Sequence, residues 1–307
     1  MPLHLWRGYL LALAAAFLWA TLGLFGKFLY RYPVDPLVVV ALRALIASST
    51  LGLILAWRNP AWLRIRRQDL PFFVVYGAVG VALNYACYFL ALRWTTVTTA
   101  VILLYLYPAL VVLGGALFLG ESLTLIKGAA LSLAFGGAFL AAQGYDASLL
   151  RLNWRGVLFG LGAAISMAVY GLMGKQRALA YAPWTITLYA IGFGAVSLTL
   201  WQGPALKGAL DYPWQVWLLI IGLAWGPTLL AYSLFTAALA HIEAGQASIA
   251  AMLEPVLAAV LAYAVLGERV DTPQWLGGLL VLGGVATLVL KRSGFKDSCA
   301  ESAGGDA

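Results

Sequence analysis

The chain has 307 residues, of which 63% are hydrophobic and only 10% are charged, and its formal net charge is +7. Soluble domains carry about 25% charged residues, so this chain lacks the polar side chains that cover a soluble globule. The composition excludes an ordinary soluble enzyme and a nucleic-acid-binding protein, because such sparse positive charge is typical of membrane-protein loops. The two cysteines, Cys87 and Cys299, form neither a disulfide framework nor a metal-binding spacing, so we expect no metal and no cofactor.

Ten apolar stretches are long enough to cross about 30 Å of hydrocarbon, which takes roughly 20 residues of helix. They predict transmembrane helices over residues 8–30, 34–57, 69–92, 96–118, 122–142, 155–177, 183–202, 213–239, 243–266 and 272–291. The first stretch follows Arg7 and resembles a signal peptide, but nine further spans favour a retained helix. The expected fold class is an all-α membrane protein with ten transmembrane helices. Residues 293–307 are small and polar, which predicts a disordered tail.

The distribution of lysine, arginine and tryptophan predicts the orientation of these spans. With the N-terminus inside the cell, the inner segments hold eleven Lys and Arg residues and the outer segments seven. We therefore expect both termini in the cytoplasm. Ten of the twelve tryptophans lie near span ends and form an aromatic belt, whereas Trp19 and Trp225 lie in the middle of a span.

An internal repeat divides the chain into two halves. Residues 7–27, shifted by 148 positions, match residues 155–175 at eleven of 21 positions, including Gly23 with Gly171. About two identities are expected by chance in such a composition. A shift of 147 pairs Tyr85 with Tyr232. The repeat predicts two units of five spans each, over residues 7–142 and 155–291.

An odd number of spans in each unit determines how the two units are related. A copied unit of five spans must enter the membrane from the opposite side, so the halves are inverted relative to each other. Inverted repeats are typical of secondary transporters, whose substrate site lies near the middle of the membrane between the halves. The alternative is a duplication retained only for stability.

The pattern of the repeats resembles a known family. Each repeat has a proline in its fourth span and a Gly-Glu pair at the end of that span: Pro108 with Gly120-Glu121, and Pro255 with Gly267-Glu268. Ten spans with this pattern resemble the EamA family of the drug/metabolite transporter superfamily, over residues 7–291. The resemblance implies export of amino acids, other metabolites or small toxic compounds across a bacterial inner membrane without ATP. The aromatic-rich spans are similar to YddG-type exporters of aromatic amino acids.

Two charged residues lie well inside the predicted spans, and charges there are costly enough to indicate function by default. Glu254 precedes Pro255, whose missing N–H leaves a carbonyl group unpaired, so Glu254 is a candidate to bind a substrate ammonium or to carry a proton. The alternative is a protonated Glu254 that is hydrogen-bonded between helices. Arg43 is a candidate for a substrate carboxylate, but a bracing or gating role is favoured.

Interrupted spans predict the position of the cavity, because free backbone groups must face a cavity and not lipid. We expect the cavity among the third, fourth, eighth and ninth spans, flanked by the first and sixth. The candidate cavity residues are Trp19, Asn84, Tyr85, Tyr88, Thr98, Thr99, Tyr105, Tyr107, Trp225, Thr228, Tyr232, Gln246, Ser248, Met252 and Glu254. The candidate gating or structural residues are Arg43, Gly80, Pro108, Pro227 and Pro255. For any single tyrosine, packing between helices is the alternative to ligand contact.

The sequence favours a secondary transporter that exports a small metabolite, an amino acid above all, by alternating access. Proton-coupled export and facilitated export are both compatible with the sequence. The expected partners are the substrate, the lipid bilayer and a proton. A membrane-embedded lipid-modifying enzyme is disfavoured because His4 and His241 lie in no polar cluster. The glycine-rich fifth and tenth spans predict a scaffold or a dimer face, so the protein is a monomer or a homodimer.

Overall fold

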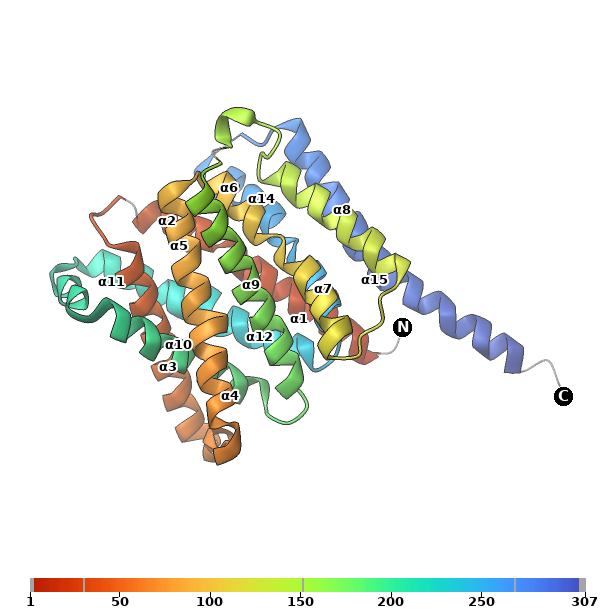
Figure 1. Cartoon of the computed structure of the whole chain (residues 1–307), viewed down its shortest axis with the longest axis horizontal. Helices are drawn as coiled ribbons and strands as arrows, with labels where there is room; N and C mark the ends of the chain where they lie inside the picture. The colour runs from red at the N-terminus through yellow and green to blue at the C-terminus, as the bar shows by residue number, and fades with distance from the viewer. Residues whose placement is uncertain (1–2, 30, 151, 268, 304–307) are drawn as a thin grey trace.

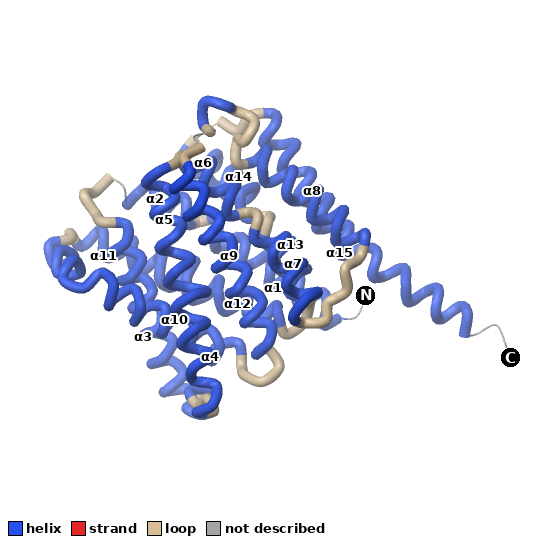
Figure 2. The backbone as a smooth tube through the Cα atoms, viewed as in Figure 1, coloured by secondary structure: helices blue, strands red, loops and turns tan. Residues whose placement is uncertain are grey.

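The structure of the chain is a computed structural model that describes residues 3–29, 31–150, 152–267 and 269–303. All regular structure in these ranges is helical, without a strand (Figure 2). Nine helical segments are long and apolar enough to cross a membrane, and a shorter apolar helix of 17 residues, Leu125–Ala141, is the tenth. The prediction of an all-α membrane protein with ten transmembrane helices in two repeats is confirmed.

The helices follow the same order in each half (Figure 1). The first half contains α1 (Leu3–Ala20), α2 (Leu22–Leu29), α3 (Pro36–Arg58), α4 (Leu70–Val75), η3 (Tyr76–Leu83), α5 (Asn84–Trp94), α6 (Val97–Leu104), α7 (Tyr107–Phe118) and α8 (Leu125–Ala141). The second half contains α9 (Trp154–Arg177), α10 (Pro183–Gln202), α11 (Trp214–Leu223), η6 (Ala224–Leu230), α12 (Ala231–Leu239), α13 (Ala244–Ala251), α14 (Glu254–Leu266) and α15 (Thr272–Ala303). Short surface helices η1 (Pro60–Leu63), η2 (Arg67–Asp69), η4 (Ala147–Leu149) and η5 (Gly203–Asp211) lie in the connections.

The two halves interrupt their helices at equivalent places. The third and eighth spans each contain a π-helical segment, η3 and η6, in which Gly80 and Pro227 occupy equivalent positions. The fourth span breaks between α6 and α7, and the ninth between α13 and α14, where Pro108 and Pro255 begin the second helix. Proline suits the first turn of a helix because it has no N–H to leave unpaired there.

Helices from one half pack against helices from the other. The first span, α1, contacts α12, α13 and α14 of the second half. The sixth span, α9, in turn contacts η3, α5, α6 and α7 of the first half. The α8 and α15 helices lie side by side at one edge of the bundle (Figure 1). The centre of the protein is therefore enclosed by helices of both repeats.

The last helix, α15, continues through Ala303 into the segment where the sequence predicts a disordered tail. Residues 304–307 of that segment lie outside the described part of the chain.

The close approach of α8 and α15 depends on glycine and yields a first test. A Cβ at Gly137 would lie 2.5 Å from the Gly277 carbonyl oxygen, whereas a Cβ at Gly136 would meet no atom within 4 Å. Overpacking costs about 1–3 kcal/mol, so we expect Gly137→Ala to lower the melting temperature in detergent. Gly136→Ala should leave it unchanged or raise it, since alanine favours a helix by about 1 kcal/mol. Equal melting temperatures for the two variants would contradict this packing.

Candidate functional site

A cavity of about 700 Å³ lies among the interrupted spans. Nine of the predicted cavity residues line it, namely Trp19, Asn84, Tyr85, Tyr88, Thr98, Tyr105, Tyr107, Tyr232 and Glu254. Three residues predicted to gate or support it, Arg43, Pro227 and Pro255, also line it. These residues come from six spans, the first to fourth, the eighth and the ninth, so the fold gathers them from both halves.

The other predicted residues lie outside the cavity wall. Four of them are buried between helices, namely Thr228, Gln246, Ser248 and Met252. Gln246 accepts a hydrogen bond from the Glu243 N–H at the start of α13, and the Ser248 hydroxyl donates to the Gly245 carbonyl. Thr99 is also buried, and its N–H donates to Thr96 at the start of α6. Gly80 and Pro108 are buried at the helix interruptions but do not line the cavity.

Trp225 is a correction to the predicted helix faces. We expect Trp225 and Tyr232 on one face because they are seven residues apart, but Trp225 is 54% exposed and donates to the Thr50 hydroxyl at 3.2 Å. Only Tyr232 lines the cavity. The physical reason is η6, because a π-helical segment has more residues per turn and shifts the face on which later residues lie.

Several cavity residues were not predicted. Met167, Leu22 and Leu223 are among them, and their apolar side chains give no signal in a sequence this hydrophobic. The repeat alignment contains one usable signal, since a shift of 148 places Met167 at the position of Trp19. The second span was not expected to line the cavity, although Val39, Val40 and Arg43 of α3 do so.

A cluster of aromatic rings, most of them packed edge to face, forms part of the cavity wall. The ring of Tyr232 lies 5.2 Å from that of Trp19 and 6.5 Å from that of Tyr85, measured between centres. Behind them, Tyr170 lies 5.1 Å from Tyr232 and 5.0 Å from Tyr76, and both are fully buried. The rings of Tyr170 and Tyr76, which are stacked on each other, therefore continue the aromatic cluster beyond the cavity and fill the core behind it.

Arg43 contributes a positive charge to the cavity wall, deeper than Lys27 at the mouth. Its guanidinium carbon lies 4.4 Å above the centre of the Tyr85 ring, which is the geometry of a cation–π contact. Within the described ranges of the chain, Arg43 has neither an ion pair nor a hydrogen bond to a backbone carbonyl. The bracing role expected for Arg43 stays a prediction, because no hydrogen bond from Arg43 to a carbonyl group supports it.

Glu254 contributes the acidic side chain of the cavity wall, at the break between α13 and α14. It stands in the first turn of α14, where the partial positive charge of the helix N-terminus favours a carboxylate. Nearby, the Tyr107 hydroxyl donates to the Ser248 carbonyl at 3.3 Å, so the breaks of both halves meet here. Among the described residues, none forms a hydrogen bond with Glu254. The structural alternative, a protonated Glu254 that is hydrogen-bonded between helices, stays a prediction.

The cavity reaches one end of the bundle. Residues at its mouth come from helix ends on the same side, namely Lys27, Leu29, Val34, Pro36, Leu92, Val97, Gln143, Leu266 and Gln274. The cavity is therefore open at that end of the helices.

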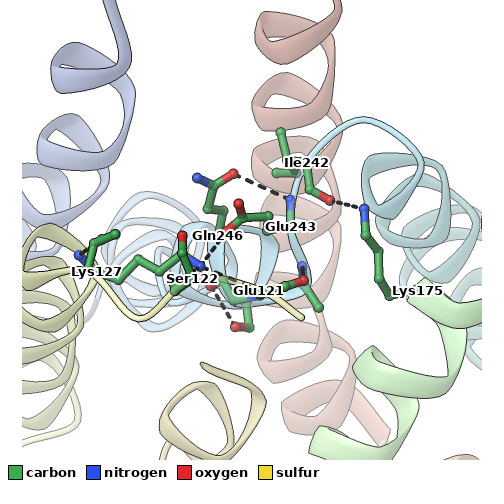
Figure 3. A network of polar contacts seen from close by, with 11 residues as sticks. Glu121, Ser122, Lys127, Lys175, Ile242, Glu243 and Gln246 are labelled. Carbon is green, nitrogen blue, oxygen red and sulfur yellow. Dashed lines mark hydrogen bonds and ion pairs between the residues drawn. The ribbon is translucent and has the colours of Figure 1, made fainter. Parts of the chain in front are cut away.

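A network of charged residues joins the helix ends on the other side (Figure 3). Glu121 accepts hydrogen bonds from the N–H groups of Ala244 and Gly245, at 2.6 and 3.2 Å, and so caps α13. Lys127 forms ion pairs with both Glu121 and Glu243 and donates to the Ser122 carbonyl. The network therefore ties the loop between α7 and α8, in the first half, to the start of the ninth span, in the second.

Lys175 extends the network to the sixth and eighth spans. Its ammonium donates to the carbonyl oxygens of Leu239 and Ile242, both at 2.7 Å (Figure 3). These carbonyls belong to the end of α12 and the loop after it, which have no further helical turn to bond them. The fourth, fifth, sixth, eighth and ninth spans are thus held together at this closed end.

Equivalent residues of the two repeats have different surroundings. Gly23 is exposed and lines the cavity, whereas its counterpart Gly171 is buried, and a Cβ there would lie 3.5 Å from Val111. Leu22 also lines the cavity, whereas Tyr170 at the equivalent position belongs to the buried aromatic cluster. The two halves therefore share a sequence pattern, but the helices are separated around Gly23 and packed together around Gly171.

Glu121 offers a test of the closed end. Glu121→Ala removes two backbone hydrogen bonds and one ion pair, and hydrogen bonds to charged groups contribute about 1.5–3 kcal/mol. We expect a clear fall in melting temperature for Glu121→Ala and a smaller fall for Glu121→Gln, which keeps an acceptor. Asp211→Ala, at an exposed carboxylate, is the control. If Glu121→Ala melted like the control, the network would not hold this end closed.

Comparison with known proteins agrees with this architecture. Residues 6–143 and 154–290 each match the family described as the EamA-like transporter family. An uncharacterized transporter of Archaeoglobus fulgidus is 30% identical over 203 residues, which cover 66% of this chain and 71% of that protein. An uncharacterized transporter of Pseudomonas aeruginosa is 29% identical and covers 88% of each chain.

Two further similarities concern substrate and fold. A protein of Streptantibioticus cattleyicolor, named as a probable terminal-alkyne amino-acid exporter, is 28% identical over 89% of this chain and 88% of its own. A solved crystal structure superimposes with a TM-score of 0.77 over 93% of this chain and 98% of its own; at 24% identity it shows a shared fold. Family and relatives alike are described as transporters and not as enzymes.

Proposed function

The chain belongs to the EamA-like transporter family, and we propose that it exports amino acids across a bacterial inner membrane by alternating access. Membership of the family makes the chain a multi-pass membrane transporter of a small molecule. The amino-acid substrate, the direction of transport and the cellular membrane are the parts that we add. The relative named as an amino-acid exporter supports this substrate class.

The observation that carries the proposal is the different environment of repeat-related residues. Gly23 lines an open cavity and Gly171 is packed in the core, although the two halves have similar sequences. If each half can adopt the conformation of the other, the cavity closes at its present mouth and opens at the opposite end. A cavity that exchanges its ends in this way moves a substrate without ATP.

The charge distribution supports one orientation of the protein in the membrane. Under the positive-inside rule, both termini lie in the cytoplasm, and the network around Lys127 lies on the cytoplasmic side. The cavity then faces the outside, and the conformation is outward-open. We propose the two units, residues 7–142 and 155–291, as the parts that exchange conformations, while α8 and α15 serve as a peripheral scaffold or a dimer face.

Glu254 is our candidate for proton coupling. It is the only Asp or Glu that lines the cavity in the described residues, and a carboxyl group that faces an open cavity can exchange protons with solvent. Proton antiport would use the inward proton gradient to drive export. Facilitated export, without this coupling, is the alternative, as is another metabolite or a cationic drug as the substrate.

The function is tested in liposomes that contain the purified protein. We expect counterflow, in which an unlabelled internal substrate drives uptake of the labelled one, for at least one of the twenty standard L-amino acids. Glu254→Gln should lose accumulation driven by a pH gradient, because a glutamine cannot carry a proton, whereas counterflow, which needs no net proton movement, should persist at a higher substrate concentration. Asp271→Asn, outside the membrane spans, is the control. Glu254→Gln with an unchanged rate and pH dependence would exclude the proton role, and no counterflow would exclude an amino-acid substrate.

A further inference from the structure

We propose that Arg43 forms a carboxylate-binding site in the cavity wall, so that the transported molecule has one free carboxylate. This proposal rests on the proposed function and deepens it, since it identifies the part of the substrate that the protein recognises. It concerns the guanidinium of Arg43, the Tyr85 ring beneath it and the indole N–H of Trp19.

The position of Arg43 prevents its charge from reaching the membrane surface. Arg43 is only 8% exposed, and the guanidinium is held over Tyr85, itself near the middle of the third span. Arginines near helix ends extend their side chains to the interface, but here the side chain points to the centre of the bundle. The charge is therefore fixed beside the cavity.

A buried cation without an anion is unstable, so Arg43 requires a partner. A charged side chain inside a membrane is costly, and pairing with a charge of opposite sign lowers that cost. The ion pairs in the described parts of the chain use Lys127 and Arg177, and none involves Arg43. The Arg43 Nε atom also has no acceptor. Water in the open cavity compensates part of this cost, and a bound anion would compensate more of it.

The chemistry of the wall selects a carboxylate. A guanidinium has five N–H donors in a planar fork, which match the two oxygens of a carboxylate. The Trp19 indole N–H, the second donor, has no acceptor either, and Trp19 is linked to Tyr85 by their contacts with Tyr232. Both residues line the cavity. This part of the wall therefore offers hydrogen-bond donors without acceptors.

The acidic side chain of Glu254 limits the substrate to a monoanion or a zwitterion. Glu254 lines the same cavity and would repel a dianion such as a phosphate ester, but it would attract an ammonium group. The repeat supplies only one such site, since the counterpart of Arg43 is Ala190, which is fully buried. A zwitterionic amino acid can satisfy Arg43 with its carboxylate and Glu254 with its ammonium.

The site is tested by ligand-induced thermal shift on the purified full-length protein. The probes are L-phenylalanine, 3-phenylpropionate, which lacks the ammonium, and phenethylamine, which lacks the carboxylate. We expect both carboxylates to raise the melting temperature, because a ligand stabilises the folded state that it binds. In Arg43→Gln their apparent affinity should fall about tenfold or more, as expected for loss of a charge-assisted bidentate contact. Arg43→Lys should be intermediate, and Arg64→Gln, at an exposed arginine, should match the wild type.

The melting temperature without ligand separates a binding role from a structural one. If Arg43 binds substrate, Arg43→Gln should melt at the same temperature as the wild type or higher, since it removes an unpaired charge. A bracing arginine would give a fall. The proposal is overturned if no carboxylate shifts the wild type, if phenethylamine shifts it equally, or if Arg43→Gln keeps the carboxylate shift. Carboxylate binding without counterflow of any amino acid would exclude the proposed function but keep this site.

Discussion

Every backbone N–H and C=O inside a membrane must be hydrogen-bonded within the protein, and the central cavity of this transporter depends on that constraint. Helices satisfy it without interruption, so a helix can break only where protein or a water-filled cavity receives the free groups. Here the breaks occur at equivalent positions of the two repeats, in the fourth and ninth spans, with π-helical segments in the third and eighth. Those four spans surround the cavity and supply most of its polar residues.

The two ends of the cavity differ because different groups meet there. At the closed end, Glu121 accepts a hydrogen bond from the start of α13, and Lys127 forms an ion pair with Glu243. Lys175 donates to a carbonyl group at the end of α12. At the open end, the position equivalent to Lys127 is Gln274, which lines the mouth. The ion pair of Lys127 with Glu121 is stronger than a contact of a neutral amide such as that of Gln274. Both side chains of this ion pair are largely buried. At this position the closed end therefore has an ion pair that a glutamine at the open end cannot form.

Much of the fold could be predicted from the sequence, because span length and the repeat are both visible there. The position of the cavity also followed, since prolines mark the breaks, and most aromatic candidates, Tyr85 and Tyr232 among them, line it. The faces of individual helices could not be predicted, because a transmembrane helix is apolar toward lipid and toward its neighbours alike. Trp225 is the clearest case, since η6 shifts its face. The contacts of Glu121 with α13 join residues 123 or more positions apart, which no local pattern reveals.

The most direct test of the account is the accessibility of the repeat-related pair Gly23 and Gly171. Each is replaced by cysteine in turn, in a chain whose Cys87 and Cys299 are replaced by serine, and cells are treated with a membrane-impermeant maleimide. The account predicts that Gly23→Cys reacts from outside, because Gly23 lines the open cavity. Gly171→Cys should be protected from outside and react only from the cytoplasmic side, faster during transport. Equal labelling of both cysteines from the same side would contradict alternating access between the inverted halves.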